Sequence, residues 1–140
     1  MNKRVGLLER IDAGEAVLHA SGYMFEMERR GYLQTGAMVP EVVLEHPEVV
    51  EQLTREFARC GSDVLLAFTY YGHREKMRII GKEHLLEPLN RNALKIALKT
   101  LNLKKGSKVL IPSFTFIATL EAILENNLQP VICDIDMSLN

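Results

Sequence analysis

Apolar runs and segments of helical period alternate along the chain. Four short apolar runs predict β-strands at residues 16–19 (AVLH), 64–68 (VLLAF), 108–111 (KVLI) and 130–136 (PVICDID). Continuous apolar runs of this length are typical of parallel strands that are covered on both faces. The order of elements is therefore expected to be β-α-β-α-β-α-β. This order predicts an α/β fold with four β-α units and a parallel sheet, because right-handed crossovers join parallel strands.

Two of the predicted helices have a clear apolar face. The first begins near Pro47, a residue suited to a first helical turn, and ends at Gly61 as a C-terminal cap. The second covers residues 87–103 and is expected to end at residues 104–106 (KKG), where lysines stabilise the negative end of the helix dipole. A shorter helix is predicted at 117–125. The apolar faces comprise Val49, Val50, Leu53, Phe57 and Ala58 in the first helix, and Leu89, Ala93, Ile96, Ala97 and Leu101 in the second.

Composition narrows the class of protein. With 140 residues, 47% hydrophobic and 25% charged, residues 1–140 are expected to form a single α/β domain or a partial domain. The formal net charge of -1, without a basic stripe, argues against nucleic-acid and anionic-membrane partners. The N-terminus has no apolar stretch of signal-peptide type, so a cytoplasmic location is expected. Cys60 and Cys133 form no CxxC or Cys/His cluster, so the sequence shows no metal site.

Three segments occur in a specific order in the first two-thirds of the chain: PEVVLEHPEVV, REFARCGSDV and AFTYYGHREK. With GEAVLHASGYMF before them and HLLEPLNRNALKIA after them, they make residues 5–97 resemble the homocysteine S-methyltransferase family, nearest its betaine–homocysteine branch. The resemblance implies a zinc-dependent (β/α)8 barrel that moves a methyl group onto homocysteine sulfur, with zinc creating the thiolate. It also implies that Gly22 and Tyr71 bind substrate, Tyr71 on the methyl-donor side.

The chain departs from this family at the positions that carry its chemistry. The family ends its first strand with an acidic-Gly-Gly turn, whereas this sequence reads Ala20-Ser21-Gly22 and matches only at Gly22. The family's zinc cysteines lie on later strands, and neither Cys60 nor Cys133 falls at their positions. We therefore expect a catalytically incomplete chain without its own zinc ligands, and no catalytic residue is assigned. Tyr71 also fits a tyrosine that simply packs at a strand end.

Two groups of polar residues in this part have structural interpretations. His73, on a polar turn beside charged neighbours, is interpreted as solvated or structural because a general base needs an oriented partner. A second group is interpreted as a solvated helix face instead of a pair of catalytic carboxylates. It comprises Glu26, Glu28, Arg29 and Arg30.

The last third of the chain has a different character. The segments NALKIALKTLNLKKGSKVL, IPSFTFIAT and PVICDID make residues 92–140 resemble the sugar aminotransferase family of pyridoxal phosphate enzymes. The resemblance implies that Phe116 stacks on the pyridoxal ring and that Asp134 or Asp136 ends the next strand near the site. Phe114 and Phe116 alternatively pack at the strand end as structural residues.

The groups that would complete a pyridoxal phosphate site are not found at their expected places. Residues 89–91 (LNR) stand where a small, hydroxyl-bearing phosphate cradle is expected. Lys104, Lys105 and Lys108 lie at a helix end and a strand entry, which makes them poor Schiff-base candidates. The catalytic lysine and the aspartate that pairs with the pyridine nitrogen are expected later than this sequence reaches. We therefore expect the chain to hold no cofactor.

The two resemblances overlap in one predicted helix, at NRNALKIAL, which places an apparent join near residues 90–97. A chimera, a recombinant, a frame-disrupted gene or a truncated chain would each give this pattern. Three functions stay open: a homocysteine S-methyltransferase-like chain, a non-catalytic or designed α/β module, and a fragment of a pyridoxal-phosphate-dependent aminotransferase. Whether the chain is an enzyme also stays open. A homo-oligomer that covers an open sheet edge is a further expectation.

Overall fold

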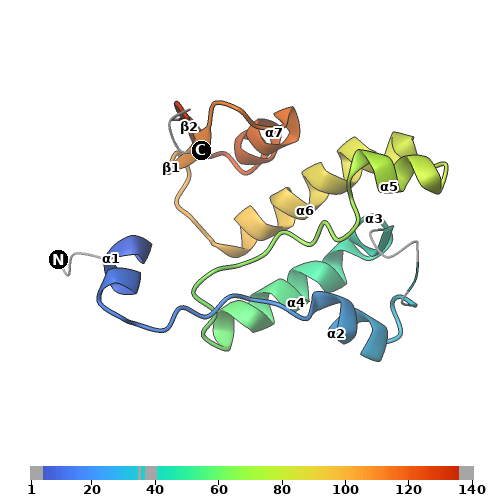
Figure 1. The fold of residues 1–140 in the computed structure, drawn as a ribbon, viewed down its shortest axis with the longest axis horizontal. Coiled ribbons are helices and arrows are strands. Elements are labelled where there is room, and N and C mark those ends of the chain that lie inside the picture. The colour runs from blue at the N-terminus through green and yellow to red at the C-terminus, as the bar shows by residue number, and fades with distance from the viewer. Residues whose placement is uncertain (1–4, 35, 37–40, 136–140) are drawn as a thin grey trace.

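The chain folds into helices and one small sheet (Figure 1), and the computed structural model describes residues 5–34, 36 and 41–135. The elements are, in chain order, α1 (Leu7–Asp12), α2 (Tyr23–Arg29), α3 (Val42–Glu45), α4 (Pro47–Arg59), α5 (Arg74–Ile79), the 3-10 helix η2 (Glu83–Leu85), α6 (Leu86–Thr100), β1 (Lys108–Pro112), α7 (Ile117–Glu125) and β2 (Gln129–Cys133). Strands β1 and β2 pair in parallel, with α7 as their crossover. The mixed α/β class and the final strand-helix-strand unit are confirmed.

The prediction of four β-α units is wrong for the described residues. Segments 16–19 and 64–68 are extended, but they meet only in a single parallel bridge between His19 and Val64. Ala20 N donates to Val64 O at 2.8 Å beside this bridge. A sheet needs a continuous ladder of hydrogen bonds between strands, and among the described residues these two segments share only this bridge. The described residues therefore contain a two-stranded parallel sheet and one isolated parallel bridge.

The two long helices follow the apolar pattern that predicts them. In α4, Pro47 occupies the first turn and Gly61 adopts a φ of 97° after the last turn, as expected for a C-terminal cap. Helix α6 ends at Thr100, one turn earlier than predicted, because Asn102 takes a left-handed conformation with a φ of 48°. The larger core comprises Ala20, Tyr23, Met27, Val42, Val43, Val49, Val50, Leu53, Phe68, Ala93 and Ile96.

Helix α6 lies between α4 and the unit formed by α7 and the sheet (Figure 1). Toward α4, Lys99 Nζ lies 2.8 Å from Glu51 Oε2. Toward α7, Glu125 forms ion pairs with two residues of α6: Arg91 Nη2 lies 2.5 Å from Glu125 Oε1, and Lys95 Nζ lies 2.9 Å from Glu125 Oε2. A separate small core fills the second unit and comprises Ile111, Ile123 and Leu128, with Leu98, Val109 and Leu120 packed against it. The helix that contains the predicted join thus contacts both units.

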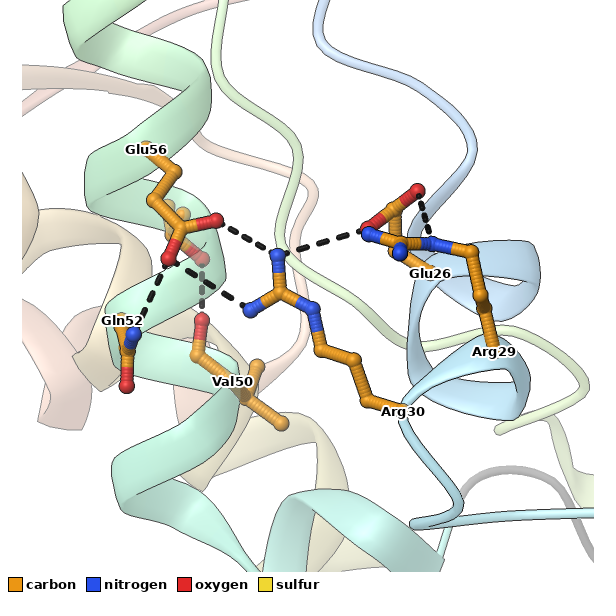
Figure 2. A network of polar contacts seen from close by, with 7 residues as sticks. Glu26, Arg29, Arg30, Val50, Gln52 and Glu56 are labelled. Carbon is orange, nitrogen blue, oxygen red and sulfur yellow. Dashed lines mark hydrogen bonds and ion pairs between the residues drawn. The ribbon is translucent and has the colours of Figure 1, made fainter.

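Ion pairs fix the end of α2 against α4. Figure 2 shows Arg30 reaching Glu56 on α4, with 2.6 Å between Nη2 and Oε2, while the same nitrogen lies 3.3 Å from Glu26 Oε2. Arg29 also pairs with Glu26, at 2.7 Å. The guanidinium of Arg30 lowers the pKa of Glu56, and Gln52 contributes a second hydrogen bond. The interpretation of this region as merely a solvated helix face is therefore wrong for Arg30, which joins two helices.

Within the part of the chain that the structure describes, no further strand pairs with either outer edge of the small sheet. The register pairs Lys108 with Gln129 and turns the N–H groups of Lys108 and Leu110 away from β2. Pro130 stands at an outward position of β2 and offers no donor there. The β1 edge is therefore the better donor edge. No helix within 5–34, 36 and 41–135 is both long and apolar enough to cross a membrane.

Candidate functional site

A cavity of about 390 Å³ opens between the start of α2 and the extended segment that precedes α5. Its wall comes from residues 21–25 and 66–70, two segments that the His19–Val64 bridge brings together. Ser21 and Thr69 supply hydroxyl groups, and no charged side chain lines the wall. Four aromatic rings line it: Tyr23, Phe25, Phe68 and Tyr70. The cavity thus suits a ligand with an apolar or methylated group.

One wall of the cavity is fixed by a glycine turn and a buried tyrosine. Gly22 directly precedes α2 with a φ of 81°, a left-handed conformation that favours glycine. Tyr23 follows, stacked on Phe68 with 5.6 Å between ring centroids and tilted against Phe57 at 4.8 Å. Burial raises the pKa of Tyr23, while Thr54 and the Leu66 backbone oppose the rise. These contacts make this wall a rigid aromatic surface.

The opposite wall ends in a tightly bonded turn. Gly72 N donates to Thr69 O at 2.5 Å, and Asn90 Nδ2 of α6 donates to Gly72 O at 2.9 Å. Tyr71 is held at a φ of 60° in this turn, a left-handed conformation that is strained for an aromatic residue. His73 then caps α5 by accepting a hydrogen bond from the Lys76 backbone, which confirms its structural interpretation. Hydrogen bonds from Gly72 N and from Asn90 thus hold this turn in one conformation.

Two tyrosines and a lysine form a cluster at this turn. The rings of Tyr70 and Tyr71 lie 4.3 Å apart, and Lys76 Nζ lies 4.6 Å from the centroid of the Tyr71 ring. A hydrogen bond with Tyr71 raises the pKa of Tyr70. The cluster joins the cavity wall, through Tyr70, to a cation outside it.

Of the two predicted substrate-binding residues, Gly22 and Tyr71, one lines the cavity and the other does not. Gly22 lines the cavity, whereas the adjacent Tyr70 lines it in place of Tyr71. Sequence reasoning missed Phe25 and Phe68. Phe25 lies in the HASGYMF segment that follows the first predicted strand, and this position is the signal that could have identified it.

The second predicted site does not come together among the described residues. Phe116 precedes α7 in the unit on the other side of α6 and is 47% exposed, while Phe114 is 85% exposed. The structural alternative, in which both rings pack at the strand end, stays a prediction. Lys108 begins β1, about 13 Å of extended chain from the strand end that Phe116 follows. The residues present do not fit pyridoxal phosphate; Asp134 is exposed, and Asp136 lies outside the described residues.

The described residues do not fit a zinc site either. No three His, Cys, Asp or Glu side chains of the described ranges come close enough to hold a metal ion. Cys60 is exposed at the end of α4, and Cys133 Sγ donates to Ile111 O at 3.3 Å at the end of β2. Neither cysteine thus belongs to a metal-binding group of the described residues.

Comparisons with known proteins give two different similarities. Residues 80–139 match the model of the DegT/DnrJ/EryC1/StrS aminotransferase family. Betaine–homocysteine S-methyltransferase 1 of Xenopus tropicalis is 42% identical over 101 residues, covering 69% of this chain and 25% of that protein. The protein of the same name from Pongo abelii is 45% identical over 85 residues, covering 61% of this chain and 21% of its own length. Both resemblances are thereby confirmed.

These similarities cover only part of each relative. The chain spans about a quarter or less of the length of the curated relatives given above. The enzyme of the same name from Rattus norvegicus shows the same relation, with 49% identity over 72 residues, 51% of this chain and 18% of that protein. No solved structure matches the chain.

Proposed function

We propose that the chain is a homocysteine S-methyltransferase-like protein that binds a small methylated ligand in the cavity formed by residues 21–25 and 66–70. One observation carries the proposal: the aromatic wall is built from the part of the chain that resembles the betaine–homocysteine methyltransferases. A quaternary ammonium group is stabilised when it lies against aromatic faces, and an uncharged wall adds no competing ion pair. Glycine betaine, which the names of these relatives contain, is therefore the first ligand to test.

We further propose how the resemblance relates to this fold. The parallel segments 16–19 and 64–68, with α4 between them, would correspond to the first two strands of a (β/α)8 barrel. Gly22 and Tyr71 would contact or support the ligand, and the sequence join would fall near 90–97 within α6. Because no metal-binding group is found within the described residues, the proposed role is binding and not complete methyl transfer.

Calorimetric titration with glycine betaine tests the proposal. Phe25→Ala and Tyr70→Ala each remove one ring from the wall, and both side chains are exposed enough to be truncated without opening the core. We expect each variant to weaken binding about fivefold, the size of one exposed cation–π contact. Phe114→Ala is the matched control, because it removes an exposed ring that lies outside this wall. Equal weakening by all three variants, or no heat from the unmodified chain, would reject the cavity as the site.

The aminotransferase match supports one alternative function, a chain derived from a pyridoxal phosphate enzyme. It predicts an absorbance band of an internal aldimine and covalent trapping of the cofactor on a lysine by borohydride. If neither betaine nor pyridoxal phosphate binds and the chain unfolds cooperatively, the third possibility, a non-catalytic α/β module, is favoured. A thermal shift with zinc and homocysteine together would instead extend the methyltransferase proposal to the thiol substrate.

A further inference from the structure

The outer edge of β1 carries backbone groups that can pair with another strand. Because the register sets Leu110 opposite Val131, the N–H groups of Lys108 and Leu110 point away from β2. The C=O groups of these two residues and of Pro112 point the same way. All three residues are exposed, and the apolar side chain of Leu110 is 68% exposed. Since the sheet of the described residues has no strand besides β1 and β2, this edge is a template for a strand of another chain.

The outer edge of β2 is less suited to this pairing. Pro130 stands at an outward position and has no N–H, so Ile132 supplies the outward donor of this strand. Pairing of β1 with β2 of a second copy also leaves an open edge at each end for further copies, which produces a filament. Pairing of β1 with β1 instead closes after two copies. The edge that offers more donors is therefore also the edge that gives a closed dimer.

We propose that the partner of this edge is a second copy of the chain, bound by antiparallel pairing of the two β1 strands around a twofold axis at Leu110. The four-stranded sheet then has the order β2-β1-β1-β2. The N–H of each Leu110 donates to the C=O of the other, and the N–H of each Lys108 donates to the C=O of Pro112 in the second copy. Pro112 has no N–H, so no backbone donor at this edge of β1 is left without a partner.

Side chains favour this register over the neighbouring one. A twofold axis at Val109 would also give four hydrogen bonds, but it would set Lys108 opposite the exposed Leu110 of the second copy. The axis at Leu110 sets leucine opposite leucine on one face of the sheet and Val109 opposite Ile111 on the other. Apolar pairs that lie directly opposite each other stabilise a pair of strands, so the register at Leu110 is the more stable one.

The charges at the two ends of the sheet also favour the antiparallel arrangement. Lys104, Lys105 and Lys108 lie at the start of β1, are exposed, and form no ion pair with a carboxylate of the described ranges. Asp134 is exposed directly after β2. Antiparallel pairing brings the basic end of one copy to the acidic end of the other, with Asp134 about 10 Å away across two strand spacings. The two Lys108 residues are about 13 Å apart along the strands, whereas parallel pairing would place the basic ends side by side.

Sedimentation velocity of the unmodified chain and of two charge variants tests the pairing. Leu110→Lys and Leu110→Glu each place two like charges opposite each other at the twofold axis, about 5 Å apart between Cβ atoms. Each variant should weaken self-association about tenfold. An equimolar mixture of the two variants should dimerise again, most strongly at low salt, because lysine then lies opposite glutamate. Leu124→Lys and Leu124→Glu are the matched controls, because this exposed leucine belongs to α7 and not to the strand edge.

Three results would overturn the proposal. The first is an unmodified chain that is monomeric at every concentration up to its solubility limit. The second is a dimer that survives both Leu110 variants, which places the contact elsewhere. The third is a mixture of the two variants that stays monomeric, which shows that residue 110 does not lie opposite its own copy. Circular dichroism establishes that the variants are folded. The cavity is formed by residues 21–25 and 66–70, so betaine affinity in Leu110→Lys should equal that of the unmodified chain, which separates this test from the proposed function.

Discussion

Replacing Gly72 by alanine tests whether close packing fixes the turn that presents Tyr70 and Tyr71. A Cβ atom at Gly72 would lie 2.8 Å from Leu89 Cδ2 and 2.8 Å from Thr69 O, well inside an ordinary carbon contact of about 3.5–4.0 Å. Leu89 is fully buried, and Thr69 O belongs to the backbone, so neither atom can move away without disturbing its neighbours. We expect overpacking to lower the free energy of unfolding by about 1–3 kcal/mol.

The measurement is urea-induced unfolding followed by circular dichroism, together with betaine titration. Gly36→Ala is the matched control: its nearest neighbour beyond the adjacent residues, Gln34 O, is 4.0 Å away, so a change within about 0.5 kcal/mol is expected. Adding Leu89→Ala to Gly72→Ala removes one of the two close contacts, and the double variant should lose less stability than the two single losses together. A Gly72→Ala chain with unchanged stability and unchanged betaine affinity would refute the packing argument.

Three further predictions concern pH, the second core and association. The Arg10 guanidinium lies 2.6 Å from Asp63 and lowers the pKa of that carboxyl group. The ion pair therefore stabilises the fold above the ordinary carboxylate pKa, and this stabilisation is lost as the pH falls through the lowered pKa. Asp63→Asn should make the free energy of unfolding less dependent on pH in acid. Ile123→Ala empties the centre of the second core and should cost about 2–5 kcal/mol, with hydrogen-exchange protection lost first in residues 106–135. A homo-oligomer is predicted to pair through the β1 edge, so Leu110→Pro should abolish it in sedimentation velocity; an oligomer that survives would place the contact elsewhere.

Local sequence signals were sufficient for α4, α7, the start of α6 and the last two strands. Pro47 and Gly61 bound α4 because they act within one turn of the backbone, and the apolar spacing of α6 identifies its buried face. The crossover from β1 to β2 also follows from the chain itself, since a strand, a short helix and a second strand in sequence favour a parallel pair. The end of α6 was predicted too late, because both Asn102 and Gly106 can adopt the left-handed conformation that ends a helix. In the structure Asn102, with a φ of 48°, comes first.

The candidate site depended more strongly on tertiary contacts. The family resemblance implied that Gly22 and Tyr71 bind substrate, and of these two residues Gly22 lines the cavity. The sequence alone does not decide which of the two adjacent tyrosines lines the wall; in the structure Tyr70 lines it, and Tyr71 takes a φ of 60° in the turn that follows. Phe68 became part of the site through its stacking on Tyr23, a contact between residues far apart in the chain.

The sequence by itself determined α4, α7, the start of α6 and the two family resemblances, since these depend on residues close together along the chain. Only the tertiary structure decided that segments 16–19 and 64–68 share one bridge and not a sheet, because a strand is completed by hydrogen bonds to neighbours that the segment does not contain. Only the tertiary structure placed Lys76 over Tyr71, since the position of a side-chain cation depends on the turn that carries the ring beneath it.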